Sequence, residues 1–303
     1  MNELVQALPG PFGEAPVPPR RSLRAALRRE RQFRVLPGFG LTLGYTLFYV
    51  SLIVLLPLSA AFERTARLGP LRFWQVVTTP RVLDSLRLSF GAALLAALIN
   101  AVFGFIIAWS LTRTRFPGRR ILDAMIDLPF ALPTAVAGIA LTALYAPNGW
   151  IGSLLADVGI KVAYTPLGVV VAMAFVSLPF VVRTLQPVLG DLDREVERAA
   201  ETLGASRLQS LRWVVLPSIW PTLLTGAALG FSRAVGEYGS VIFIAGNIPK
   251  VSEIAPLMIM IKLQQYQYSQ ATAIAVVMLV ASFALMFGIN ALQLWAQRRR
   301  SAR

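Results

Sequence analysis

Two carboxylates, Asp123 and Asp127, stand one helical turn apart at the start of an apolar run. Paired carboxylates inside a membrane could relay protons or act together as a general acid and base. They follow Arg119 and Arg120 directly. Acids at a helix N-terminus are stabilised by the helix dipole and by neighbouring cations. A position close to the membrane interface favours this structural role over proton transfer.

A second charged pair, Arg233 and Glu237, follows the apolar run 214–231. At this spacing the two side chains can pair on a helix, and the short run predicts them at or near membrane depth, facing protein or water. In one interpretation Arg233 attracts an anion along a transport route and the glycines let the backbone bend; in the other the pair is structural. Both stay open. The residues of this possible route are Ser232, Arg233, Gly236, Glu237, Tyr238 and Gly239.

The residue types that are missing exclude several kinds of chemistry. The chain contains no cysteine and no histidine, so thiol nucleophiles, disulfides, histidine bases and the usual zinc sites are excluded. The phosphate-binding pattern G-x-x-x-x-G-K-[ST] is also missing. We expect no cofactor on this chain. If ATP drives it, a separate polypeptide binds the nucleotide and its Mg²⁺.

The segment 191–217 is rich in charge within an otherwise apolar chain, and its pattern predicts two short helices joined by a corner. One narrow apolar stripe at helical spacing comprises Leu192, Val196, Ala199, Ala200 and Leu203. Gly204 follows, where a helix favours a residue with positive φ. Ser206 and Gln209 then have the spacing of a capping box for a second helix. This shape suits a surface that another protein grips.

The composition predicts the elements that position these residues. Apolar residues make up 56% of the 303 positions and charged residues 15%, below the usual share of about 25% in soluble domains. We therefore predict an all-α integral membrane protein with about six transmembrane helices. The expected spans are 41–62, 88–111, 124–146, 167–189, 215–237 and 269–295. Arg183 is expected to extend to the inner interface. The run 241–245 is too short to cross a membrane, and we expect it to be a re-entrant, interfacial or buried segment.

The distribution of charge predicts the orientation of the chain. The net charge is +14, and most arginines fall in the N-terminal tail, in the loops around residues 115 and 200, and at the C-terminus. The positive-inside rule then places both termini in the cytoplasm. Since this asymmetry accounts for the charge, we expect no nucleic-acid partner. Residues 1–36 are rich in proline and arginine and are predicted to be a disordered tail near anionic lipid.

The segment 191–217 also resembles the cytoplasmic motif of ATP-binding-cassette (ABC) importer permeases, EAA-x3-G-x9-I-x-L-P. The matching residues are Ala199, Ala200, Gly204, Val214, Leu216 and Pro217, with Arg198 in place of the motif glutamate and Glu197 before it. The resemblance implies a type I ABC importer permease fold with a cytoplasmic coupling helix. It implies an ATPase-coupling surface formed by Glu197, Arg198, Ala199, Ala200, Leu203, Gly204 and Ala205.

Longer stretches resemble the T-type subunits of sulfate/thiosulfate importers, namely residues 115–119, 127–138, 177–184 and 236–249, within a similarity over about 35–297. The family implies a bacterial inner-membrane heterodimer with a W-type permease, two ATP-binding subunits and a periplasmic sulfate/thiosulfate-binding protein. It also implies a peripheral first helix and outer loop over 37–82, a permease domain over 83–294 and a basic cytoplasmic tail over 295–303.

Three alternatives follow from the same residues. Some of the matching pieces are shared with molybdate permeases, so a molybdate or tungstate carrier is one alternative. An ATP-independent secondary transporter should show a mid-span ionisable pair and an inverted repeat, and neither is clear here. A membrane-embedded enzyme would have to use Asp123 and Asp127. Collapse of an ion gradient would stop the secondary transporter, and Asp→Asn substitutions would stop the enzyme.

Overall fold

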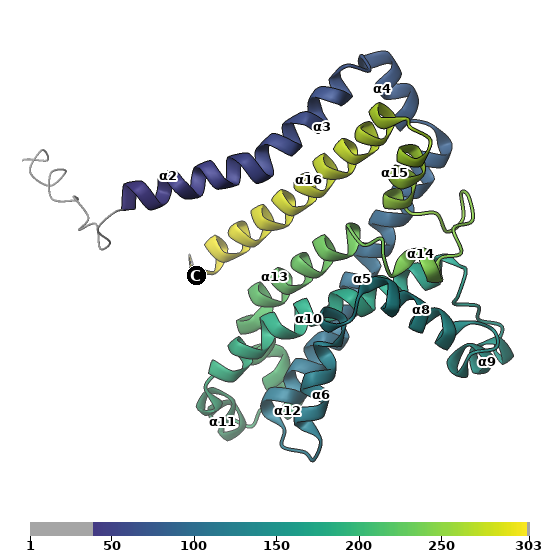
Figure 1. The fold of residues 1–303 in the computed structure, drawn as a ribbon. Helices are drawn as coiled ribbons and strands as arrows, with labels where there is room; N and C mark the ends of the chain where they lie inside the picture. The colour runs from purple at the N-terminus through teal and green to yellow at the C-terminus, as the bar shows by residue number, and fades with distance from the viewer. Residues whose placement is uncertain (1–38, 302–303) are drawn as a thin grey trace, which may run out of the picture. The chain divides into compact units, whose positions relative to one another are not determined.

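The computed structural model describes residues 39–301, and every regular element in that range is a helix (Figure 1). The elements are α2 (Phe39–Val50), η1 (Ser51–Leu55), α3 (Leu56–Ala66), α4 (Pro70–Val77), α5 (Pro80–Arg113), α6 (Arg119–Ile126), α7 (Leu128–Ala131), α8 (Thr134–Tyr145), α9 (Trp150–Asp157), α10 (Pro166–Asp191), α11 (Arg194–Thr202), α12 (Arg207–Ser210), η2 (Leu211–Val215), α13 (Leu216–Val235), α14 (Val241–Ile244), α15 (Ala255–Gln264) and α16 (Tyr268–Ser301). The all-α prediction is confirmed.

The chain divides into two compact units, residues 1–57 and residues 58–303. The described part of the first unit is α2, η1 and the first two residues of α3, all of which belong to the apolar helix Phe39–Ala66. The predicted tail 1–36 lies outside the described residues. The predicted boundary between residues 82 and 83 stays a prediction.

Five helices of the described chain are long and apolar enough to cross a membrane, and they coincide with five of the expected spans. These are Phe39–Ala66, Pro80–Arg113, Pro166–Asp191, Arg207–Val235 and Tyr268–Ala291. The apolar helices α8 and α9 meet at a bend of 41° and would make a sixth span if they cross together. The expected number of about six is therefore confirmed.

The prediction of one continuous span over 124–146 is wrong. Helix α6 ends at Ile126, and α7 and α8 follow as separate helices. Leu132 is extended, with ψ of 136°, because the ring of the following Pro133 disfavours helical backbone at the preceding residue. By contrast, α10 remains one helix through Pro179 and Pro187. A proline within an apolar run can therefore break a helix, as Pro133 does, or be accommodated within it, as Pro179 and Pro187 are, and the sequence alone does not distinguish the two outcomes.

The core of the second unit is the crossing of α5, α10 and α13, which approach closely through small residues. A Cβ atom on Gly104 of α5 would lie 2.9 Å from Cγ1 of Val181 on α10, and one on Gly226 of α13 would lie 3.2 Å from the Cα of the same valine. Buried Asn100 of α5 donates to the Ser177 hydroxyl of α10 at 2.8 Å. Close packing and interhelical hydrogen bonds of this kind hold membrane helices together.

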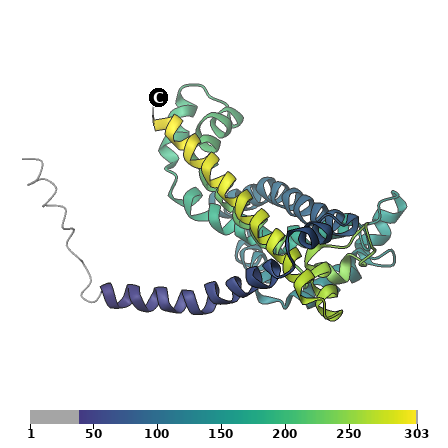
Figure 2. The same cartoon turned by 90° about the horizontal axis from the view of Figure 1, so that it is seen from above.

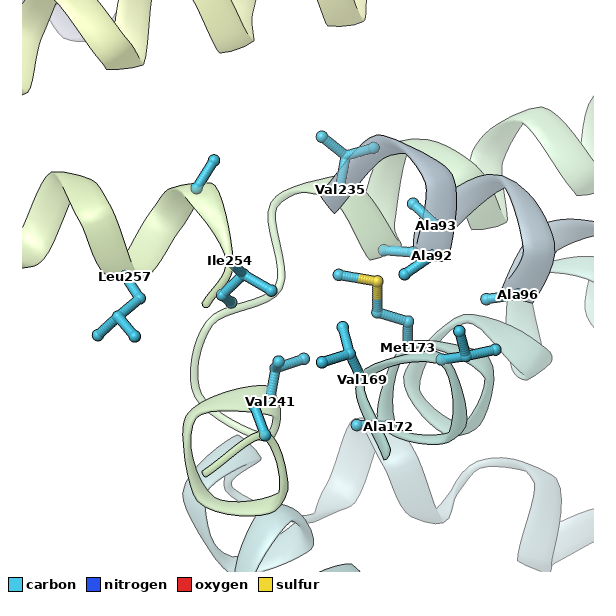
Figure 3. Packing of buried hydrophobic residues seen from close by; sticks show 14 of the residues in the cluster. Ala92, Ala93, Ala96, Val169, Ala172, Met173, Val235, Val241, Ile254 and Leu257 are labelled. Carbon is cyan, nitrogen blue, oxygen red and sulfur yellow. The ribbon is translucent and has the colours of Figure 1, made fainter. Parts of the chain in front are cut away.

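A second part of the core lies where the ends of several helices meet. Figure 3 shows Met173 of α10 between alanines of α5, such as Ala93, and the side of Val241 and Ile254. Val241 and Ile244 of α14 are buried, which agrees with the buried-segment alternative for the run 241–245, although Phe243 is exposed. This part of the core fixes the start of α15 against α5, because the Ser89 hydroxyl accepts from the Ala255 N–H at 2.8 Å.

The long helices give the second unit two distinct ends. Figures 1 and 2 both show α16 running from the end that carries α4 and α15 toward the end that carries α11. Helix α5 also connects these ends. Its 34 residues correspond to a length of about 50 Å. The first end is called the α4 end below, and the second the α11 end.

Candidate functional site

The candidate coupling surface begins with α11, whose start is fixed by local signals. The Asp193 carboxylate accepts from the Glu195 N–H at 2.9 Å, which satisfies one of the free donors of the first turn. Glu195 and Glu197 lie in that turn, where negative charge is favoured by the helix dipole. The charge-rich sequence therefore forms a well-capped helix at the α11 end of the unit.

The corner after α11 has the geometry that the sequence predicts. Gly204 has a φ of +86°, and its N–H donates to the Glu201 carbonyl at 2.9 Å. The Ala205 N–H donates to the Ala200 carbonyl at 3.0 Å. These two bonds form a Schellman motif, which needs a residue with positive φ between them. The glycine at this position is thus a backbone requirement.

The second helix also starts as predicted. The Ser206 hydroxyl accepts from the Gln209 N–H, and the Gln209 side chain accepts from the Ser206 N–H, which completes a capping box. From α12 the helical backbone continues through η2 into α13, without leaving the span Arg207–Val235. The corner is therefore joined to a membrane-length helix without a break in the helical backbone.

Apolar side chains on this surface lack a cover within the described chain. Val196 is 49% exposed, Leu203 88% and Leu208 73%. The small residue Ala199 is also exposed, while Ala200 is half-buried. Isolated exposed apolar residues are ordinary, but here they lie on α11, at its C-cap and on α12, on both sides of one corner. Such an arrangement fits a docking surface for another protein.

Arg113, at the end of α5, anchors this surface. Its Nη2 donates to the Leu192 carbonyl at 2.8 Å and lies 3.1 Å from a carboxylate oxygen of Glu197. The guanidinium also stacks on the Trp109 ring, 5.7 Å from its centroid. Only 8% of the Arg113 side chain is exposed. The sequence had indicated this arginine only as a positive charge in an inner loop, since nothing local signals a contact across 79 residues.

Because of the contact with Arg113, the neighbouring charged residues Glu197 and Arg198 have different surroundings. Glu197 is turned toward Arg113 of its own chain, whereas Arg198 is exposed. The side chain that replaces the motif glutamate is therefore the one available to a partner. Both residues line a pocket of about 400 Å³ together with Arg207 and Glu201.

The possible route residues 232–239 lie at the other end of α13. Arg233 and Glu237 form an ion pair of 2.6 Å, as their spacing predicts, although α13 ends between them at Val235. Glu237 is 2% exposed and also accepts from the Ser240 N–H and hydroxyl, both at 2.9 Å. The pair is thus part of a buried turn. Ser232 and Gly236 are exposed.

Close packing requires the glycine at position 239 of this turn, whereas a Cβ atom on Gly236 would meet nothing within 4 Å. A Cβ atom on Gly239 would collide with the Thr134 hydroxyl of α8, and one on Gly138 would collide with the Ser240 carbonyl. Gly239 and Gly236 are both outside the left-handed region. Tyr238 is half-buried. The predicted route residues and the coupling surface are therefore two separate places, joined by one helix of 29 residues.

The paired acids have a different partner from the one expected. Arg183 of α10 donates to the Asp123 carboxylate at 2.7 Å and to the Asp127 carboxylate at 2.8 Å. Gln186 donates to Asp123 at 2.9 Å. The pKa of Asp123 is lowered, mainly by the hydrogen bond from Gln186 and further by the contacts with Arg183. Partial burial acts in the opposite direction but does not outweigh these contacts.

The expected position at a helix N-terminus holds for one of the two acids. Asp123 lies inside α6, whereas Asp127 is the N-cap residue of the short helix α7, without a side-chain capping hydrogen bond. Arg183 contacts both carboxylates, and its expected extension to the inner interface stays a prediction. The structural role itself is supported, because the cluster ties α6 to α10. The sequence contains no signal for these contacts, because Arg183 is 56 positions from Asp127 and 60 positions from Asp123.

An all-α chain with several membrane spans and an exposed, rigid corner belongs to the class of membrane-spanning subunits of multi-protein transporters. A family model described as "Binding-protein-dependent transport system inner membrane component" matches residues 100–302. The chain belongs to this family. It is a permease subunit of an ABC transporter and not itself an enzyme.

Relatives with the name "Sulfate transport system permease protein CysT" are similar over most of the chain. Those of Salmonella typhimurium and Escherichia coli are each 55% identical over 260 residues, which cover 86% of this chain and 94% of the relative. The one of Synechocystis sp. is 51% identical over 253 residues, covering 84% and 88%.

Among solved structures, a bacterial ABC transporter involved in the import of the acidic polysaccharide alginate matches with a TM-score of 0.69. It covers 83% of this chain and 93% of that chain at 14% identity. A methionine ABC transporter in an inward-facing conformation matches with a TM-score of 0.51 and 17% identity, covering 70% and 94%. At these identities the likeness concerns the fold alone, and it is the fold of an ABC importer permease.

Proposed function

We propose that this chain is the T-type permease subunit of an ATP-driven importer that carries sulfate or thiosulfate into the cytoplasm. The names of the similar proteins support sulfate as the substrate. The observation that carries the ATP-driven part is the capped, exposed corner formed by α11, Gly204 and α12. The chain has no nucleotide-binding loop of its own, so ATP and Mg²⁺ belong on a partner subunit.

The proposed assembly contains a W-type permease as heterodimer partner, two ATP-binding subunits and a periplasmic sulfate/thiosulfate-binding protein. The family's description as binding-protein-dependent supports the last of these. In this proposal the chain crosses the bacterial inner membrane several times with both termini in the cytoplasm, in contact with lipid and not with nucleic acid. The excess of arginine in the corresponding loops supports that orientation.

The proposed mechanism is alternating access driven through the corner. Closure of the ATP-binding subunits displaces α11, and the continuous backbone from α12 into α13 passes the displacement to the membrane. A two-state change requires a contact that differs between the states. The exposed Val196, Leu203 and Leu208 and the charged Arg198 supply groups for such a contact.

At the far end of α13, the segment 232–239 is the proposed outer part of the anion route. Arg233 is 34% exposed although Glu237 balances its charge. A half-buried guanidinium held in place by a buried carboxylate would offer an anion its remaining N–H donors at a fixed position. Ser232 and Gly236 are exposed beside it.

The test is uptake of radiolabelled sulfate into proteoliposomes that contain all the subunits, with the binding protein on the outer side. We expect uptake to require both ATP and the binding protein, and to persist when an ionophore collapses proton and sodium gradients. Excess molybdate should compete weakly. Strong competition would reassign the substrate to the molybdate class, and uptake that follows an ion gradient without ATP would contradict the proposal.

A further inference from the structure

A pocket of about 560 Å³ lies at the α4 end of the second unit, between α4, the start of α5, α15 and the start of α16. None of the residues that line it belongs to the coupling surface or to the segment 232–239. The pocket is about the length of α5 away from Arg113. In the proposed orientation it therefore faces the outer compartment.

The lining of this pocket is strongly biased in charge. Three cations, Arg72, Arg81 and Lys262, come from three different helices. None of the described residues that line the pocket is acidic. Gln75, Gln265 and Gln270 add neutral side chains with N–H donors. A pocket lined by cations and amide donors is suited to an anion that accepts several hydrogen bonds.

The buried carboxylate of Glu253 holds one of these cations, Arg81, in place. Arg81 donates through Nε and Nη2 to the two carboxylate oxygens of Glu253, each at 2.7 Å. Glu253 is buried, with 1% of its side chain exposed, whereas 40% of the Arg81 side chain is exposed. The bidentate contact fixes the plane of the guanidinium. The remaining N–H groups on Nη1 are not used by this contact.

The net charge of the surroundings matches a dianion. Glu253 offsets one of the three positive charges, so Arg72 and Lys262 supply the excess. Lys262 donates to the side chain of Gln267 at 2.9 Å, a neutral partner. The ion pairs of the described residues leave both Arg72 and Lys262 without a carboxylate.

We infer that this pocket is an accessory site for a tetrahedral dianionic oxyanion of the sulfate type on the outer face of the subunit. It would hold the anion near the entrance after the binding protein delivers it, or retain it against escape. The inference rests on the proposed function for its substrate. The same chemistry would also accept the phosphate of a lipid headgroup, so the experiment has to separate the two sources.

The experiment uses the complete importer in nanodiscs of uncharged phosphatidylcholine, without ATP and without the binding protein, and measures the affinity for radiolabelled sulfate. The double variant Arg72→Gln, Lys262→Gln should bind sulfate about tenfold more weakly, since it removes two charge-assisted contacts in a partly exposed site. The control Arg87→Gln, Lys161→Gln removes two exposed cations outside the pocket and should change the affinity by less than about twofold.

Equal affinity of the two double variants would overturn the inference. So would a pocket variant that binds sulfate normally but loses an anionic lipid in nanodiscs containing phosphatidylglycerol, or loses only its affinity for the binding protein. Sulfate import by the wild-type importer distinguishes failure of the accessory-site inference from failure of the proposed function. If it imports sulfate while the pocket variants bind sulfate unchanged, only the accessory site is wrong. If it imports no sulfate at all, the substrate assignment fails as well.

Discussion

Replacement of Gly204 by valine is expected to disconnect ATP hydrolysis from sulfate uptake without unfolding the subunit. At the φ of +86° a side chain with a Cβ atom is strained by roughly 1–2 kcal/mol, and a β-branched one by more. Space is not the problem, because a Cβ atom at this position meets nothing within 4 Å. The cost therefore falls on the corner alone.

A strain of about 2 kcal/mol shifts the balance between the native corner and rearranged corners by about 30-fold. The Schellman bonds to Glu201 and Ala200 are then lost in a large share of molecules, and α11 no longer has a fixed direction relative to α12. The assay is the ratio of sulfate imported to ATP hydrolysed in proteoliposomes. We expect this ratio to fall in the order Gly, Asn, Ala, Val, because asparagine tolerates positive φ better than other side chains.

The matched control is Gly190→Val at the end of α10. Gly190 is also exposed with open space around its Cβ position, but its φ is not in the left-handed region. This variant should keep the wild-type ratio. Normal coupling in Gly204→Val, or equal losses in both variants, would refute the argument that the backbone of this corner transmits the force.

Three further predictions concern other contacts. Arg113→Gln, which removes the anchor of α11, should cost about 1.5–3 kcal/mol locally and make the 191–213 segment more sensitive to trypsin; unchanged digestion would contradict the anchor. Because the pKa of Asp123 is lowered from 3.8, its stabilising contribution is complete above that pH and disappears as the pH falls through the lower folded value. Thermal melts should therefore show a shallower acid-side loss for Asp123→Asn, and identical pH profiles would count against this contact. Gly138→Ala should lower the free energy of unfolding by about 1–3 kcal/mol, and with it the melting temperature, because the added Cβ atom would collide with the backbone of Ser240, the residue before α14. Gly91→Ala, in open space, should not. Equal melting temperatures of the two variants would show that α8 does not pack this closely on Ser240.

The elements that the sequence predicted well depend on local signals. The positive φ of Gly204 and the capping box of Ser206 and Gln209 each need only a few neighbouring residues, and both are confirmed. Five spans were likewise predictable, because about 20 consecutive apolar residues are needed to cross a bilayer. The broken region 124–146 was misread because its apolar composition outweighed the effect of Pro133 on the residue before it.

The contacts that the sequence could not predict join residues that are distant along the chain. Arg113 contacts Leu192 and Glu197, and Arg183 contacts two acids near residue 125. In a sequence with many arginines, charge alone assigns no partner. The packing of α10 beside α6, and of the end of α5 beside α11, brings these groups together. The pocket at the α4 end has the same origin, since its cations come from three helices.

In the proposed mechanism, an ATP-binding subunit acts on this chain from the cytoplasm at the corner around Gly204. The natural chain contains no cysteine, so Leu203→Cys introduces a single thiol at a position that is 88% exposed. A matched variant, Leu71→Cys, places the thiol on α4 at the other end of the unit, at a position 73% exposed.

The most direct measurement treats intact spheroplasts and inverted membrane vesicles with a membrane-impermeant maleimide that carries a photocrosslinker. We expect the thiol at position 203 to react only in inverted vesicles and then to crosslink to an ATP-binding subunit, with a crosslinking yield that changes when ATP is added. The thiol at position 71 should react only in spheroplasts. Labelling of position 203 from the outside, or labelling from the inside with no crosslinked subunit, would contradict the account.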